Sequence, residues 1–138
     1  FTDVPLETWI GRVPGLESAP VPGAASALDC RNNRLAWLAM RQDGFLEAVA
    51  AARKRYGADR IALLVGTSTG SIGATEEAYR RLAEAGAIPP SLRAPVLHMA
   101  HSLGRFVQET LGLTGICTTV TTACSSSAKV FAQAERLI

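Results

Sequence analysis

The hydrophobic pattern of this chain predicts short strands alternating with amphipathic helices. Residues 60–65, RIALLV, are continuously apolar after Arg60, which is typical of a strand covered on both faces. Residues 116–122 form a second short run rich in β-branched side chains. Elsewhere, apolar side chains recur at three- and four-residue steps, which indicates helices that bury one face. The helices predicted in this way cover residues 32–56, 72–84 and 95–111, and a last one begins after residue 124.

The order of these elements is strand, helix, loop, helix, strand, helix. That order is typical of a right-handed parallel crossover, in which the second strand returns beside the first and runs in the same direction. The predicted fold class is therefore α/β, with parallel strands joined by crossover helices.

Local signals predict where the first helix begins and ends. Asp29 is expected to cap the helix over residues 32–56, and Gly57 is expected to end it. Gly44 weakens that helix by up to about 1 kcal/mol relative to alanine, which permits a bend.

The beginning of the chain is expected to differ from the rest. Residues 1–26 contain four of the seven prolines and show neither a helical nor an alternating period. We expect residues 1–28 to form an irregular arm over the surface, with Trp9 and Ile10 as its anchor points, and residues 29–138 to form the folded body.

Length and charge exclude several classes of protein. A chain of 138 residues is long enough for one domain, and a formal net charge of +2 without massed basic residues gives no case for nucleic-acid binding. No run approaches the roughly 18 apolar residues of a membrane span, and no signal peptide is evident. The three widely spaced cysteines favour a reducing cytoplasm over a disulfide framework. The chain starts with Phe1 and stops within a helical pattern, which favours a segment of a longer protein.

Cys124 is the candidate for chemistry. It follows the strand over residues 116–122 and precedes a helical pattern, so it is expected where a helix begins. Helix N-termini offer unpaired N–H groups and partial positive charge, and thiols placed there ionise below the free pKa of about 8.5. The alternative is a buried structural thiol, which is common for cysteine and which we expect for Cys30.

Three sequence stretches resemble the β-ketoacyl synthases, the condensing enzymes of the thiolase superfamily. TTACSSSA at residues 121–128 resembles their nucleophile motif, GLTG at residues 112–115 resembles its lead-in, and VGTSTGSIGATEEAY at residues 65–79 resembles their second strand and glycine-rich turn. The resemblance runs from about Asp29 to the last residue, with a looser likeness in PLETWIGRV near the start. It covers less than half of a synthase.

This resemblance implies a partial thiolase-like fold, the N-terminal half of a synthase, and a function. The implied reaction is a decarboxylative Claisen condensation in fatty-acid or polyketide synthesis, in which Cys124 holds an acyl group and malonyl-acyl carrier protein extends it. No cofactor is implied, because phosphopantetheine belongs to the carrier protein. Retention of Cys124 favours the condensing type over the chain-length factors, which lack the nucleophile.

The same resemblance implies partners. These are acyl carrier protein, a C-terminal half that contributes two histidines and a lysine, and a second subunit that pairs with the edge strand at residues 116–122. The dimer is expected to be a homodimer or a synthase heterodimer. Lys129, five residues after Cys124, does not match the family's catalytic lysine.

Two other patterns do not support a site. The glycine-rich stretch at residues 66–73 lacks the Walker lysine and the dinucleotide spacing, so we expect it to allow a sharp turn and close packing of a helix. His98 and His101 have ligand-capable spacing, but a metal site would need further ligands such as Cys117 or Cys124. We expect no metal, and core or interface roles for both histidines.

Three alternative functions remain open from the sequence. The first is another thiolase-fold enzyme that acts on coenzyme A thioesters, and the second is an inactive half-domain with a role in assembly. The third is a cysteine hydrolase that uses His98 or His101 as its base, which requires hydrogen-bond reach to Cys124.

Overall fold

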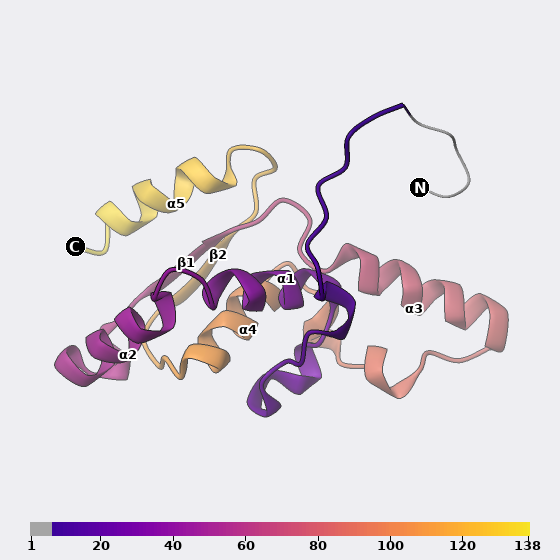
Figure 1. Ribbon diagram of the computed structural model, residues 1–138, viewed down its shortest axis with the longest axis horizontal. Coiled ribbons are helices and arrows are strands. Elements are labelled where there is room, and N and C mark those ends of the chain that lie inside the picture. Colours follow the sequence, from indigo (N-terminus) through magenta and orange to yellow (C-terminus); the bar gives the residue numbers. More distant parts are fainter. Residues whose placement is uncertain (1–6) are drawn as a thin grey trace.

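The computed structural model describes residues 7–138, and a two-stranded parallel sheet lies at its centre (Figure 1). Strand β1 (Leu63–Gly66) pairs with β2 (Cys117–Val120), with Leu63 opposite Cys117 and Gly66 opposite Val120. Both strands are shorter than the predicted apolar runs, but the parallel pairing and the α/β class are confirmed.

One edge of β2 faces away from β1. The Leu63 N–H donates to the Ile116 carbonyl at 2.7 Å, and the Thr67 N–H donates to the Val120 carbonyl at 3.1 Å. Because backbone groups alternate in direction along a parallel ladder, the N–H groups of Cys117 and Thr119 point to the outer edge. Within residues 7–138 no third strand joins the sheet.

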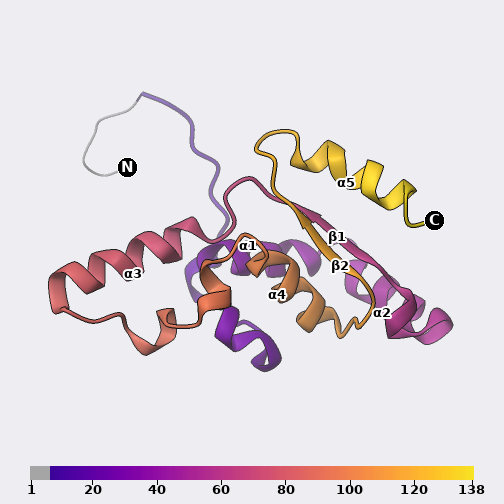
Figure 2. The same ribbon diagram turned by 180° about the vertical axis from the view of Figure 1, so that it is seen from behind.

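Helices cover the two faces of the sheet unequally. Helix α5 (Ser126–Glu135) packs on one face, and α4 (Ser102–Leu111) packs on the other, with α1 (Arg31–Met40) and α2 (Phe45–Tyr56) beside it (Figures 1 and 2). Helix α3 (Ile72–Ala85) extends away from the sheet. No helix in the described part of the chain is long and apolar enough to cross a membrane.

The core lies on the α4 side of the sheet. Phe106 is fully buried on α4 and is surrounded by apolar side chains from other elements. The buried members of this cluster are Ala25, Leu28, Met40, Phe106, Val107, Leu111 and Leu113. Burial of side chains of this size contributes about 1.5–3 kcal/mol each, so this cluster holds α4 against the sheet.

The predicted helix over residues 95–111 is wrong at its beginning. Pro95–His98 forms a short 3₁₀ helix, and α4 starts only at Ser102. Met99 lies between them and is 55% exposed, in a segment that the predicted helix had included.

The predicted single helix over residues 32–56 is also wrong, because the structure has α1 and α2 in its place. Asp43 and Gly44 between them adopt left-handed conformations, with φ of 53° and 71°, which ends one helix before the next begins. Gly57 ends α2 as predicted, and its N–H donates to the Arg53 carbonyl at 2.9 Å.

Asp29 does not cap α1. Cys30 occupies the cap position without a side-chain hydrogen bond, while the Asp29 carboxylate accepts a hydrogen bond from Arg34 Nε at 2.6 Å. The prediction of an Asp29 cap is wrong because the ion pair with Arg34 uses the same carboxylate.

The first part of the chain differs from a simple surface arm. Trp9 is fully exposed and Ile10 is about half exposed, so neither anchors the chain to the residues described. Instead, 3₁₀ helices at Leu16–Ser18 and Gly23–Leu28 place Leu16 and Leu28 in buried positions. The first two residues of the PLETWIGRV stretch lie outside the described residues.

Helix α3 agrees with the predicted span of residues 72–84. It ends at Gly86, which is left-handed with φ of 68° and donates its N–H to the Leu82 carbonyl. Exposed ion pairs of Arg80 with Glu77 and Glu84 run along its surface. Such pairs contribute little stability, so the helix depends on the buried Ala78 side and on the 3₁₀ helices at Pro90–Leu92 and Pro95–His98 that it contacts.

Gly104 allows α4 to lie against β2. A methyl group at this position would overlap Thr119 Oγ1 and approach the His101 ring to 3.2 Å. We predict that Gly104→Ala lowers the free energy of unfolding by about 1–3 kcal/mol, because overpacking outweighs the better helix propensity of alanine. Urea unfolding measures the difference.

Gly73→Ala is the matched control, because Gly73 is also helical and has no atom within 4 Å of the added methyl group. It should leave stability unchanged or raise it by up to about 1 kcal/mol. Equal effects of the two substitutions would contradict the close approach at Gly104.

Candidate active site

Cys124 lies in a tight turn between β2 and α5. After β2 ends at Val120, the Ser125 N–H donates to the Thr122 carbonyl at 3.3 Å, and the Ser126 N–H donates to the Ala123 carbonyl at 3.2 Å. Cys124 therefore stands two residues before Ser126, the first residue of α5, and its side chain is exposed. An exposed thiol at this point is open to a substrate from solution.

The residue before Cys124 has an unusual backbone conformation. Ala123 has φ of 52°, and Asp43 is the only other non-glycine residue with positive φ in residues 7–138. The left-handed region costs an alanine about 1–3 kcal/mol and persists only where the surroundings hold it. This conformation turns the chain sharply between the strand and the helix.

Ser126 contributes most of the side-chain hydrogen bonding in this turn. Its side chain is buried, and Oγ accepts the Thr122 N–H at 2.8 Å. The same hydroxyl donates its one proton to the Ala123 carbonyl at 2.7 Å, the nearer of two carbonyl oxygens, and the Thr67 carbonyl lies 3.1 Å away. Ser126 thus holds the turn together and also places it against the end of β1.

Ser125 also bonds within the turn. Its Oγ donates to the Thr122 carbonyl at 2.7 Å and lies 3.0 Å from Thr122 Oγ1. Neither serine forms a side-chain cap on α5. Their hydroxyls instead stabilise the turn that precedes the helix.

Gly66 lets α5 begin close to β1. A methyl group on Gly66 would stand 2.9 Å from the Ser126 carbonyl carbon and 3.0 Å from the Ser127 nitrogen. The glycine-rich stretch was expected to let a helix pack closely, and α3 is the helix that follows it in the sequence. The structure instead brings α5 against Gly66, a contact between segments far apart in sequence.

The other two cysteines are placed differently. Cys30 is buried before α1, and burial raises the pKa of its thiol. Cys117 is half-buried at the opposite end of β2 from Cys124, and burial raises its pKa as well. The expected structural role of Cys30 agrees with its burial.

The two histidines take part in structural hydrogen bonds. His98 Nε2 donates to the Leu92 carbonyl at 2.7 Å, so Nδ1 accepts from the Thr75 hydroxyl at 2.9 Å. His101 Nδ1 lies 2.7 Å from Thr119 Oγ1. Among residues 7–138, no group of three or more His, Cys, Asp or Glu side chains is placed to hold a metal ion.

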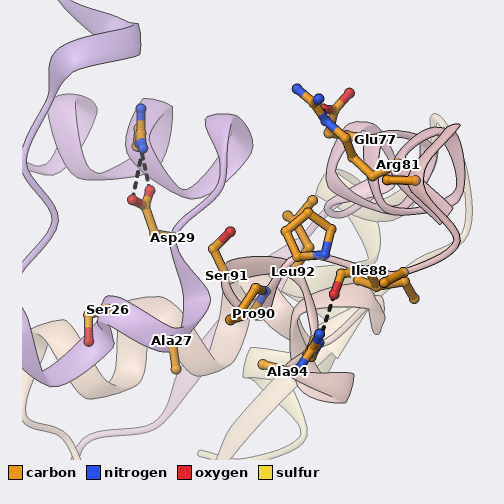
Figure 3. A pocket seen from close by; sticks show the side chains of 15 residues that line it. Ser26, Ala27, Asp29, Glu77, Arg81, Ile88, Pro90, Ser91, Leu92 and Ala94 are labelled. Carbon is orange, nitrogen blue, oxygen red and sulfur yellow. Dashed lines mark hydrogen bonds and ion pairs between the residues drawn. The ribbon is translucent and has the colours of Figure 1, made fainter.

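One hollow in the described part of the chain is separate from Cys124. Figure 3 shows this hollow of about 880 Å³ between the 3₁₀ helix at Gly23–Leu28 and the segment after α3. Its guanidinium groups already have partners, as Arg34 bonds to Asp29, Arg81 to Glu77 and Arg93 to the Ile88 carbonyl. Because no residue of the turn lines it, it does not form part of the candidate site.

Comparison with known proteins identifies the family. Residues 31–138 match the family described as Beta-ketoacyl synthase, N-terminal domain. The chain belongs to this family of condensing enzymes and has its thiolase-like α/β fold, as the sequence motifs predicted. No curated protein matches the chain.

A solved structure agrees with this assignment. The chain is similar to a ketosynthase (ApeO) from Xenorhabdus doucetiae, whose structure is described in complex with its chain length factor (ApeC). The TM-score is 0.75 and the sequences are 30% identical, over 87% of this chain and 30% of that chain. This chain therefore spans under a third of the length of the ketosynthase.

The left-handed conformation of Ala123 gives a direct test of the turn. We predict that Ala123→Gly leaves the free energy of unfolding unchanged or raises it by up to about 1 kcal/mol, because glycine adopts positive φ without steric cost. Ala123→Val should lower it by about 1–3 kcal/mol, since a β-branched residue resists that conformation. Urea unfolding of both variants measures these changes.

Ala128→Val is the control for the valine substitution, because Ala128 is exposed within α5. Its cost should not exceed the helix-propensity difference of about 0.7 kcal/mol. An Ala123→Val variant as stable as Ala128→Val would contradict the strained turn.

Proposed function

We propose that this chain is the nucleophile-bearing part of a β-ketoacyl synthase, in which Cys124 accepts an acyl group from a carrier-protein thioester. The observation that carries the proposal is the exposed Cys124 thiol in the strained turn between β2 and α5, in a chain of the β-ketoacyl synthase family. Because Cys124 is retained, the chain is of the condensing type and not a chain-length factor.

The first step is acyl transfer to sulfur. The Cys124 thiolate attacks the carbonyl carbon of the acyl thioester, a carbon–sulfur bond forms, and the carbonyl oxygen becomes an oxyanion. The oxyanion then collapses, the bond to the carrier sulfur breaks, and the carrier thiolate leaves and takes a proton. The Cys124 N–H is the oxyanion donor in this proposal, since the N–H groups of Ser125 and Ser126 are used within the turn.

The second step needs groups beyond these 138 residues. Malonyl-acyl carrier protein loses carbon dioxide, and the resulting carbanion attacks the acyl group on Cys124 and releases the sulfur. The family's two histidines and lysine for this step belong to its C-terminal half. His98 and His101 are not those histidines: both ring nitrogens of His98 bond, to Leu92 and Thr75, and His101 Nδ1 bonds to Thr119 Oγ1. The isolated chain is therefore expected to be acylated but not to condense.

Partners follow from the same proposal. Acyl carrier protein supplies the substrate on its own phosphopantetheine, in the cytoplasm, for fatty-acid or polyketide synthesis. A second synthase-type subunit, identical or homologous, pairs with the outer edge of β2, where the N–H groups of Cys117 and Thr119 point away from β1. The description of the similar ketosynthase with a chain length factor supports pairing of this kind.

Cys124→Ala tests the acyl transfer. We predict that incubation with a hexanoyl-carrier-protein thioester adds one acyl group to the chain, observed by intact mass spectrometry, and that Cys124→Ala abolishes the addition. Cys30→Ala and Cys117→Ala are the matched controls and should retain it, since both thiols are less exposed than Cys124. Acylation that persists in Cys124→Ala would contradict the proposal. Faster transfer from hexanoyl-coenzyme A than from the carrier protein would favour a thiolase-type enzyme.

The edge of β2 tests the proposed dimer. We predict that sedimentation velocity shows a species of twice the chain mass, and that Cys117→Pro weakens this association because proline removes an N–H from the outer edge. Cys117→Ala keeps the N–H and should associate like the unmodified chain. If the unmodified chain stays monomeric at every protein concentration tested, pairing through this edge is contradicted.

A further inference from the structure

Ser126 stands out because its hydroxyl contacts backbone groups on both sides of the strained residue Ala123. Oγ accepts the N–H of Thr122, the residue before Ala123, at 2.8 Å, and it donates to the carbonyl of Ala123 at 2.7 Å. The Ser126 N–H also donates to that carbonyl at 3.2 Å. Two donors on one residue therefore fix the direction of the Ala123 carbonyl.

The direction of this carbonyl determines where the Cys124 N–H points. The Ala123 C=O and the Cys124 N–H belong to one planar trans peptide, in which the two bonds point in opposite directions. With the carbonyl held toward Ser126, the Cys124 N–H is held away from it. A small rotation of this peptide would re-aim the N–H without moving the Cys124 sulfur far.

The surroundings give Ser126 little freedom to move. It is 2% exposed, and Oγ lies 3.1 Å from the Thr67 carbonyl at the end of β1. Gly66 lies directly against its backbone, with space for hydrogen only. Ser126 is thus held against the sheet, and its hydrogen bonds hold the turn in place relative to the sheet.

We propose that Ser126 is a positioning residue that aims the Cys124 N–H at the oxyanion of the acyl-transfer step, through its hydrogen bond to the Ala123 carbonyl. The inference rests on the proposed acyl transfer to Cys124. The two reactions of Cys124 have different requirements. Alkylation requires only a reactive sulfur, whereas acyl transfer also requires a hydrogen-bond donor directed at the oxyanion. Alkylation by iodoacetamide forms no oxyanion, so it reports the sulfur alone.

Ser126→Ala tests the proposal through the ratio of two rates. Acylation of Cys124 by hexanoyl-N-acetylcysteamine is measured by mass spectrometry beside alkylation by iodoacetamide. We expect the acylation rate to fall about tenfold and the alkylation rate to change less than about twofold. A misdirected oxyanion donor should reduce the acylation rate less than complete removal of a donor, which costs about a hundredfold or more. A merely structural Ser126 would slow both reactions together or neither, and either result would overturn the proposal.

Matched variants keep the result interpretable. Ser127→Ala removes an exposed hydroxyl from the next position and should leave both rates unchanged. If Ser126→Ala does not fold, Ser126→Thr and Ser126→Val replace it as a pair of equal shape, and only the threonine variant should keep the normal ratio of rates. Equal ratios in this pair would overturn the proposal. Failure of the unmodified chain to be acylated would instead refute the acyl transfer itself, which distinguishes the two claims.

Discussion

The close contact between the end of β1 and the beginning of α5 is the constraint on which the site depends. Gly66 has no side chain, so the backbone of Ser126 and Ser127 lies against it, and the Ser126 hydroxyl reaches Thr67. The chain leaving β2 must then turn within a few residues to meet this position. The left-handed Ala123 and the exposed Cys124 are consequences of that short connection.

The described residues bury the apolar side chains on one face of the sheet more completely than those on the other. The α4 side has a closed cluster around Phe106, whereas on the α5 side Phe131 is 77% exposed and an apolar groove runs between α5, β1 and α2. Two-stranded sheets seldom stand alone, because their edges and apolar faces need cover. The chain spans 30% of the similar ketosynthase, and we expect marginal stability for it without further chain or a partner.

The sequence predicted those features that depend on local pattern. The parallel strands, α3, the end of α2 at Gly57 and the turn containing Cys124 all agree with apolar periods, glycine positions and the TTACSSSA motif. The motifs also predicted the family correctly.

The errors arose where tertiary contacts or backbone strain decide the structure. Apolar steps of three and four residues resume after the polar residues 41–44, so periodicity predicted one helix. Gly44 permitted a bend, but nothing local indicated that Asp43 and Gly44 would both be left-handed and divide the helix. Asp29 has a good capping side chain, but Arg34 binds it. Similarly, no local signal indicates that Gly66 allows close packing of α5 and not of α3, or that the Ser126 hydroxyl lies beside Thr67. These contacts join residues about 60 apart in the sequence.

The most direct measurement is the alkylation rate of each cysteine against pH, with each site resolved by peptide mass spectrometry. If Cys124 is the nucleophile, it should react at lower pH than either other cysteine, because Cys30 and Cys117 are held back by burial, which raises the pKa of both thiols. Equal rates for all three, rising together near pH of about 8.5 as for unfolded thiols, would contradict the claim that this turn prepares Cys124 for reaction.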